Sequence, residues 1–117
     1  MASFAVLEIG ELNIKGQIIK YMMREGAGYV PHGYANGYVE FKIGDKDTEY
    51  IDFDFDVHGG LTFGDRFTDI AEKEVFWLGF DTAHCQDGPH LDRDYVMREI
   101  ERLAEQIVVW ELKKGVR

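Results

Sequence analysis

A histidine followed by two glycines interrupts a strictly patterned stretch of the chain. Apolar and acidic residues alternate through 51–57, and the alternation ends at His58, Gly59 and Gly60. An imidazole takes up or releases a proton near neutral pH. Glycine permits a sharp turn or the close approach of a backbone amide to a ligand. We therefore expect His58 at the mouth of a strand, beside amide donors, with the hydroxyl of Thr62 close by.

A second group of polar residues follows another apolar run. The nearly continuous apolar segment 75–81 ends on Asp81, and His84 and Asp87 come shortly after it. If the two strand ends lie on the same side of one sheet, these side chains converge with His58. The sequence therefore predicts one small polar pocket built from both stretches.

Three chemistries fit such a pocket, and the residues do not choose between them. In the first, glycine amides and imidazoles bind a phosphorylated or nucleotide-like small molecule, with Trp77 stacking on it. In the second, His58 and His84 act as acid and base in phosphodiester hydrolysis, and Asp81 or Asp87 orients a ring. In the third, two histidines and a carboxylate hold a divalent metal that activates water. No spacing matches a specific metal signature, so the metal and any cofactor stay unknown.

A purely structural interpretation competes with all three chemistries. A His-Gly-Gly sequence after a strand is often a simple turn, and an Asp-x-x-His pair can be a cap or a local hydrogen bond. Cys85, the single cysteine, is a weaker candidate nucleophile, because its neighbour His84 is adjacent in sequence and adjacent side chains rarely face each other.

The elements that position these residues can be predicted from hydrophobic periodicity and turn residues. We expect strands at 3–10, 17–25, 37–43, 49–57 and 75–81, a surface excursion at 64–74, and a helix at 92–114. Asn36-Gly37 is a strong turn dipeptide, and 37–43 should pair with 49–57 as a hairpin. The predicted fold class is α+β, an antiparallel sheet of about four to five strands packed by one long C-terminal helix, in a single domain over 1–117.

The helix has the clearest signature of any element. Apolar residues recur at helical spacing, Asp92 or Asp94 can cap its start, and Gly115 can end it. The stripe consists of Val96, Ile100, Leu103 and Ile107. The four consecutive apolar residues 107–110 exceed a single face, which predicts a homo-oligomer seam along the C-terminal helix.

The amino-acid composition limits the classes of partner that this protein can bind. Asp and Glu outnumber Lys and Arg 22 to 13, giving a formal net charge of −9. Such a surface repels nucleic acid and anionic membranes, and no apolar run reaches the ~20 residues of a membrane span. With one cysteine and no signal-peptide pattern, we expect a cytoplasmic protein. The row Asp52, Asp54 and Asp56 suggests either a solvated sheet face or an acidic inhibitor that binds another protein.

Four stretches together resemble a family of small, uncharacterised proteins found widely in bacteriophages and prophages. They are "NGYV" (36–39), "DVHGGLTF" (56–63), "WLGFDTAHCQD" (77–87) and "YVMREIERLAEQI" (95–107). The family pattern, with its HGGLT and GFDxAHxxD motifs, falls on His58, Gly59, Gly60, Thr62, Asp81, His84 and Asp87. Many relatives carry a longer insertion between Phe63 and Trp77.

The resemblance implies a phage-encoded accessory protein that acts in the host cytosol. Such proteins commonly counter host defence by sequestering or destroying a small signalling molecule, or by blocking a defence protein. This implication is an association, because fold and family do not fix function.

Overall fold

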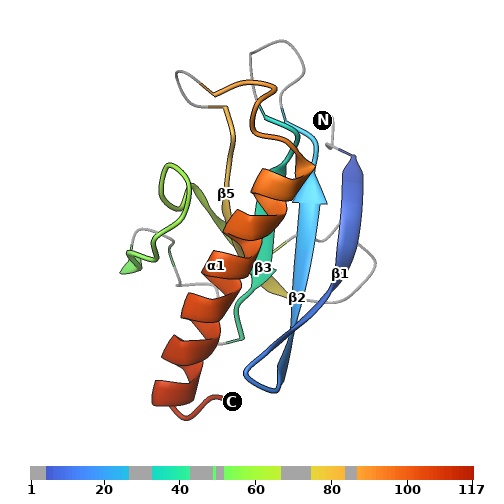
Figure 1. The fold of residues 1–117 in the computed structure, drawn as a ribbon. Helices are drawn as coiled ribbons and strands as arrows, with labels where there is room; N and C mark the ends of the chain where they lie inside the picture. The colour runs from blue at the N-terminus through green and yellow to red at the C-terminus, as the bar shows by residue number, and fades with distance from the viewer. Residues whose placement is uncertain (1–4, 27–32, 43–48, 50–51, 67–74, 84–86) are drawn as a thin grey trace.

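A computed structural model describes residues 5–26, 33–42, 49, 52–66, 75–83 and 87–117. The elements are β1 (Val6–Ile14), β2 (Gln17–Arg24), β3 (Asn36–Glu40), β4 (Phe63–Arg66), β5 (Phe76–Phe80) and α1 (Arg93–Lys113). Within these residues the strands form one antiparallel sheet in the order β1-β2-β3-β5-β4. α1 lies diagonally across one face of this sheet (Figure 1). The fold is therefore α+β, as predicted.

β1 and β2 form a hairpin around Lys15 and Gly16. Both residues have positive φ, +53° and +79°, which the tight two-residue turns of hairpins require. The side chain of Asn13 accepts a hydrogen bond from the Gly16 amide at 3.0 Å. The strand predicted at 17–25 is confirmed, and the first strand continues to Ile14, beyond the predicted 3–10.

α1 begins and ends close to the predicted positions. Asp92 caps it by accepting a hydrogen bond from the Tyr95 amide, and Gly115 follows its C-terminus with a φ of +77°. The predicted stripe of Val96, Ile100, Leu103 and Ile107 is fully buried.

The apolar run 107–110 is accommodated within the chain. Ile107 and Val108 are fully buried, and the Trp110 ring packs against the rings of Phe41 and Phe53 at 5.3 and 5.5 Å. The length of this run is thus explained without a dimer seam.

The segment predicted as the fourth strand is not part of the sheet. β3 pairs with β2 on one side and β5 on the other, so the predicted hairpin between 37–43 and 49–57 is wrong. The alternation is nevertheless real in residues 52–57, which we call the acidic arm. Its apolar side chains are half-buried or buried and its three aspartates are exposed. The arm packs its apolar face beside α1 instead of joining a strand.

Side chains of α1 take the place of a neighbouring strand for the acidic arm. The Asp56 amide donates to Gln106 Oε1 at 2.6 Å, and Gln106 Nε2 donates to the Asp56 carbonyl at 2.8 Å. One carboxamide therefore satisfies the same two backbone groups that a strand residue exchanges with its partner. Periodicity in sequence identifies which face is buried, but it does not identify what covers that face.

Two further expectations differ from the structure. Part of the predicted surface excursion 64–74 is strand: β4 pairs with β5 at the edge of the sheet. Asn36-Gly37 opens β3 instead of forming a turn. A Cβ at Gly37 would lie 2.6 Å from the Phe80 ring, so glycine at this position serves close packing between strands.

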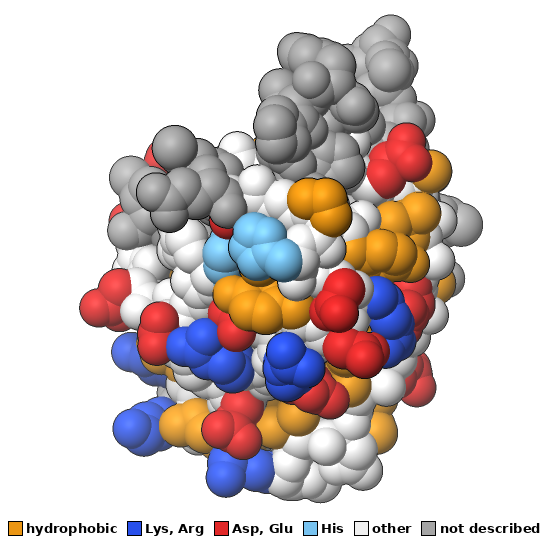
Figure 2. All heavy atoms as spheres, turned by 45° about the horizontal axis from the view of Figure 1, so that its top comes forward, with side chains coloured by type: hydrophobic (Ala, Val, Ile, Leu, Met, Phe, Trp, Pro, Cys, Tyr) orange, Lys and Arg blue, Asp and Glu red, His pale blue; other side chains and the backbone are white. Residues whose placement is uncertain are grey.

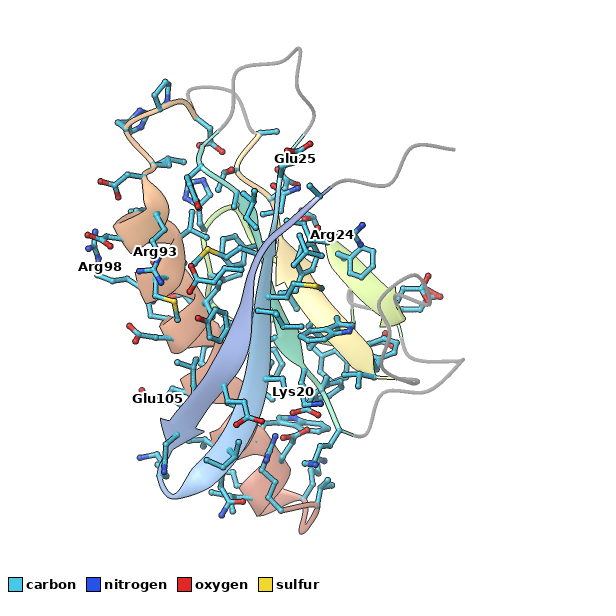
Figure 3. The ribbon with its side chains drawn as sticks, turned by 90° about the vertical axis from the view of Figure 1, so that its right-hand side faces the viewer. Lys20, Arg24, Glu25, Arg93, Arg98 and Glu105 are labelled. Atoms are coloured by element: carbon cyan, nitrogen blue, oxygen red, sulfur yellow. The ribbon has the colours of Figure 1, made fainter. Side chains whose placement is uncertain are left out.

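β5 is buried on both faces, as its continuous apolar sequence predicts. Phe76, Leu78 and Phe80 join the core beneath α1, whereas Trp77 packs with Met22 and Tyr38 in a second cluster. Because side chains alternate along a strand, these clusters lie on opposite faces. Figure 3 shows the sheet from its β1 edge, with α1 on one side only.

A buried ion pair fixes the far end of α1. Glu111 is fully buried, and its Oε1 contacts Arg117 Nε at 2.5 Å. Its second carboxylate oxygen accepts from the Lys42 amide at 2.6 Å. Arg117 also donates from Nη1 to the Ile18 carbonyl at 3.1 Å. The C-terminal residues are thereby joined both to β2 and to the chain that follows β3.

Candidate functional site: the His58 turn and the acidic arm

The His-Gly-Gly sequence makes a tight turn, as expected. The Gly60 amide donates to the Val57 carbonyl at 2.8 Å, and Gly59 has a φ of +67°. A positive φ at the third residue of a turn closed by this bond is the pattern of a type II turn. The Gly60 amide is consequently engaged inside the protein.

One residue of the second predicted group, Asp87, contacts His58. Its Nε2 lies 3.0 Å from each carboxylate oxygen of Asp87, and its Nδ1 lies 2.7 Å from the Tyr95 hydroxyl. The side chains of His58 and Asp87 are 18% and 8% exposed. His58 thus bridges the end of the acidic arm, the loop before α1 and the first turns of α1.

The proton positions follow from the partners, because a carboxylate only accepts. We assign the proton of the neutral His58 ring to Nε2, facing Asp87, so that Nδ1 accepts from the Tyr95 hydroxyl. Burial raises the pKa of Tyr95 above its usual value, and the carboxylates of Glu99 and Asp87 raise it further. Tyr95 therefore keeps its proton and acts as the donor.

Glu99 extends this network along α1. Its Oε1 accepts from the His58 amide at 2.8 Å, and both of its oxygens accept from Arg102 Nη1 at 2.9 Å. Tyr95, Glu99 and Gln106 come from neighbouring turns of one side of the helix. All three hold the stretch from Asp56 to His58 in place.

The other predicted site residues that the structure describes, Trp77, Asp81 and Thr62, have different neighbours from those of His58. Trp77 is 3% exposed and belongs to the cluster on the opposite face of the sheet. Asp81 Oδ1 accepts from the Ala83 amide at 2.9 Å, and its charge raises the pKa of Tyr38 on that same opposite face. The Thr62 amide donates to the Gly79 carbonyl and the residue is exposed. His84 and Cys85 lie outside the described residues.

Two open cavities flank the acidic arm. The larger, about 480 Å³, is lined by Phe53, Asp54, Phe55, Asp56, Val57, Gly60 and Leu61. The other, about 290 Å³, is lined by Phe55, Glu105, Gln106, Val109, Trp110 and Lys113. Phe55 borders both, and its ring stacks on Phe53 with the centroids 5.7 Å apart. The larger cavity has the size of a ligand site, and its charged groups are carboxylates.

The charges near the arm differ in how they are paired. Asp56 forms an ion pair with Arg102 at 2.6 Å. Within the part of the chain that the structure describes, the carboxylates of Asp52 and Asp54 have no such partner. On the outer face of α1, by contrast, basic and acidic side chains alternate (Figure 2). Asp52 and Asp54 thus put two exposed carboxylates without an ion-pair partner in the described residues on one face of the arm.

Neither a metal cluster nor a membrane-spanning helix is found in the described ranges. No three His, Cys, Asp or Glu side chains there are arranged to hold a metal ion. None of the helical residues described forms a stretch long and apolar enough to cross a bilayer.

Comparison of the chain with protein-family models, with curated proteins and with solved structures gave no match.

Proposed function

We propose that this chain is a binding protein that docks a basic segment of a partner protein on its acidic arm. The observation that carries this proposal is the pair of exposed Asp52 and Asp54 carboxylates beside an open cavity whose lining combines apolar and acidic side chains. Charges of one sign beside apolar side chains favour a partner of opposite charge that also carries apolar side chains. The net charge of −9 strengthens attraction over longer range.

In this proposal His58 is a positioning residue. Both of its ring nitrogens and its backbone amide are engaged by Asp87, Tyr95 and Glu99. Such a network rigidifies the segment that it joins. His58 therefore fixes the end of the acidic arm against α1, which lowers the ordering cost when a partner binds.

A phosphorylated small molecule in the His58 pocket remains a prediction that the geometry supports less well. Asp87 occupies the Nε2 edge of the His58 ring, and the Gly60 amide is used in the turn. A phosphate would meet carboxylates at the adjoining cavity. Mass spectrometry of small molecules released on denaturation, with elemental analysis for metals, tests this alternative directly.

Acid–base chemistry is a second candidate, favoured by one specific arrangement. The Tyr95 hydroxyl, the His58 ring and the Asp87 carboxylate stand in the order of nucleophile, base and orienting acid, with contacts of 2.7 and 3.0 Å. Against it, the pKa of Tyr95 is raised, so that the phenol is not activated in the resting state. Hydrolysis of bis(p-nitrophenyl) phosphate that is lost in Tyr95→Phe and Asp87→Asn would favour this candidate.

The resemblance to phage and prophage proteins supplies the biological setting of the proposal. It implies an accessory protein in the host cytosol, and the partner would then be a host defence protein that is blocked by sequestration. A homo-oligomer through the C-terminal helix belongs to the same set of proposals, and sedimentation velocity tests it.

The experiment for the docking proposal uses a peptide of alternating lysine and valine as the probe. Peptide binding is followed by Trp110 fluorescence, because Trp110 lines the neighbouring cavity. The double variant Asp52→Lys/Asp54→Lys should bind about 10-fold more weakly, and the difference should shrink as salt is added. The matched control, Glu11→Lys/Glu101→Lys, changes the net charge equally at exposed sites outside the arm. Equal weakening in both variants would refute a role for the arm.

A further inference from the structure

One edge of the acidic arm carries backbone groups with no partner. The peptide groups of Phe53, Asp54 and Phe55 make no hydrogen bond within the described residues. Unpaired N–H and C=O groups along an extended segment are a template for another strand. The arm is therefore incomplete as a piece of β-structure.

The direction of the unpaired N–H and C=O groups follows from the hydrogen bonds that the acidic arm makes to α1. Asp56 gives both of its backbone groups to Gln106, and the His58 amide points to Glu99, so these alternate residues face α1. Successive peptide groups of an extended chain point to opposite sides. The N–H and C=O groups of Phe53 and Phe55 thus face away from the helix.

The larger cavity borders the residues that carry these free groups. Phe53 and Phe55 line it together with Gly60 and Leu61, which follow in the chain. An added strand would place one set of its side chains beside Phe55 and Leu61. The alternate set would lie on the face that carries Asp52 and Asp54, whose carboxylates have no ion-pair partner in the described residues.

The geometry points to strand addition: the acidic arm binds an extended segment of a partner protein in which Lys or Arg alternates with apolar residues. This inference rests on the proposed function and specifies its partner and its mode of binding. Main-chain hydrogen bonds to Phe53 and Phe55 supply affinity, and the alternating side chains supply register and specificity. Charge complementarity with the aspartates selects a basic segment over an acidic one.

The test uses the lysine–valine peptide and two isomers that are N-methylated on alternate residues. In a strand, N–H groups of alternate residues point to one edge, so only one isomer blocks the bonds to the arm. We expect that isomer to bind about 10-fold or more weakly, and the other to bind like the parent. Hydrogen exchange of the Phe53 and Phe55 amides should slow at least 10-fold on binding of the parent peptide.

The outcomes separate this inference from the proposed function. If both isomers bind like the parent and Asp52→Lys/Asp54→Lys still weakens binding, docking on the arm stands and strand addition is refuted. If no peptide binds at millimolar concentration, both fail. If the Phe53 and Phe55 amides become protected as the protein's own concentration rises, without peptide, the occupant is a second copy and the inference is overturned.

Discussion

Truncation of Arg117 should destabilise the fold more than any other single change at the end of α1. The guanidinium is the ion-pair partner of Glu111, whose side chain has no solvent exposure, and the Arg117 side chain is itself only 3% exposed. Removing one member of a buried pair leaves an uncompensated charge and costs about 3–5 kcal/mol. Arg117→Ala therefore turns a satisfied carboxylate into an isolated buried one.

A second, smaller contribution to the free energy of unfolding favours the variant over the wild type. Arg117 Nη2 is buried and has no hydrogen-bond partner in the described structure. The wild-type protein already bears the cost of that unsatisfied donor, about 1–3 kcal/mol. The Lys42 amide still donates to Glu111 in the variant. The net loss expected for Arg117→Ala is thus about 2 kcal/mol, a substantial part of the ~5–15 kcal/mol stability of a small domain.

Urea unfolding followed by circular dichroism measures this loss. The midpoint should fall with little change in the slope against urea concentration. The matched control is Lys113→Ala, which removes an exposed cation from the last turn of α1 and should cost under about 0.5 kcal/mol. The double variant Glu111→Gln/Arg117→Met keeps an acceptor for Lys42 without a buried charge and should recover most of the stability. A loss below about 1 kcal/mol in Arg117→Ala, or a double variant no more stable than it, would refute the reasoning.

Three other changes test the packing and the electrostatics. Burial raises the pKa of Tyr38 above its usual value of 10. The neutral phenol therefore stabilises the fold below pH 10, and this stability is lost as the pH rises through the pKa that Tyr38 has in the folded state. Tyr38→Phe should flatten the alkaline limb of a stability–pH profile measured by urea unfolding. Gly79→Ala would place a Cβ 2.4 Å from Tyr38 Cδ1, and calorimetry should show a loss of about 1–3 kcal/mol. Gln106→Leu removes both bonds to Asp56, so hydrogen exchange of the Asp56 amide should accelerate while the helical circular dichroism signal stays constant.

Much of the fold could be predicted because its elements are locally encoded. The stripe of Val96, Ile100 and Leu103 and the cap at Asp92 define α1 within a residue of its true start. β5 is apolar throughout because it is covered on both faces. β4 was missed because an edge strand of four residues, Phe63–Arg66, has too few apolar residues for a periodic signal.

The pairing of elements and the details of the site are not locally encoded. The sequence predicted that His58 and Asp87 would converge only if the two strand ends lay on the same side of one sheet, and the structure places these two side chains in contact. Tyr95 and Glu99 were missed because a polar residue on an amphipathic helix ordinarily faces solvent. The only feature of the sequence that points to these two residues is their position next to the buried stripe. Which part of the chain lies opposite them along α1 is set by the packing of the whole fold.

The bonds by which α1 holds the acidic arm, its end at His58 and the chain after β3 also constrain the order in which the chain acquires its structure. They join His58 to Glu99 over 41 residues, Asp56 to Gln106 over 50, and Lys42 to Glu111 over 69. The hairpin of β1 and β2 needs only its own turn and can form as soon as both strands are synthesised. The arm and the inner face of the sheet must wait for α1, because closing long loops precedes the contacts that stabilise them. The inner face of the sheet is therefore covered only after α1 has left the ribosome, and folding should then proceed in one cooperative step.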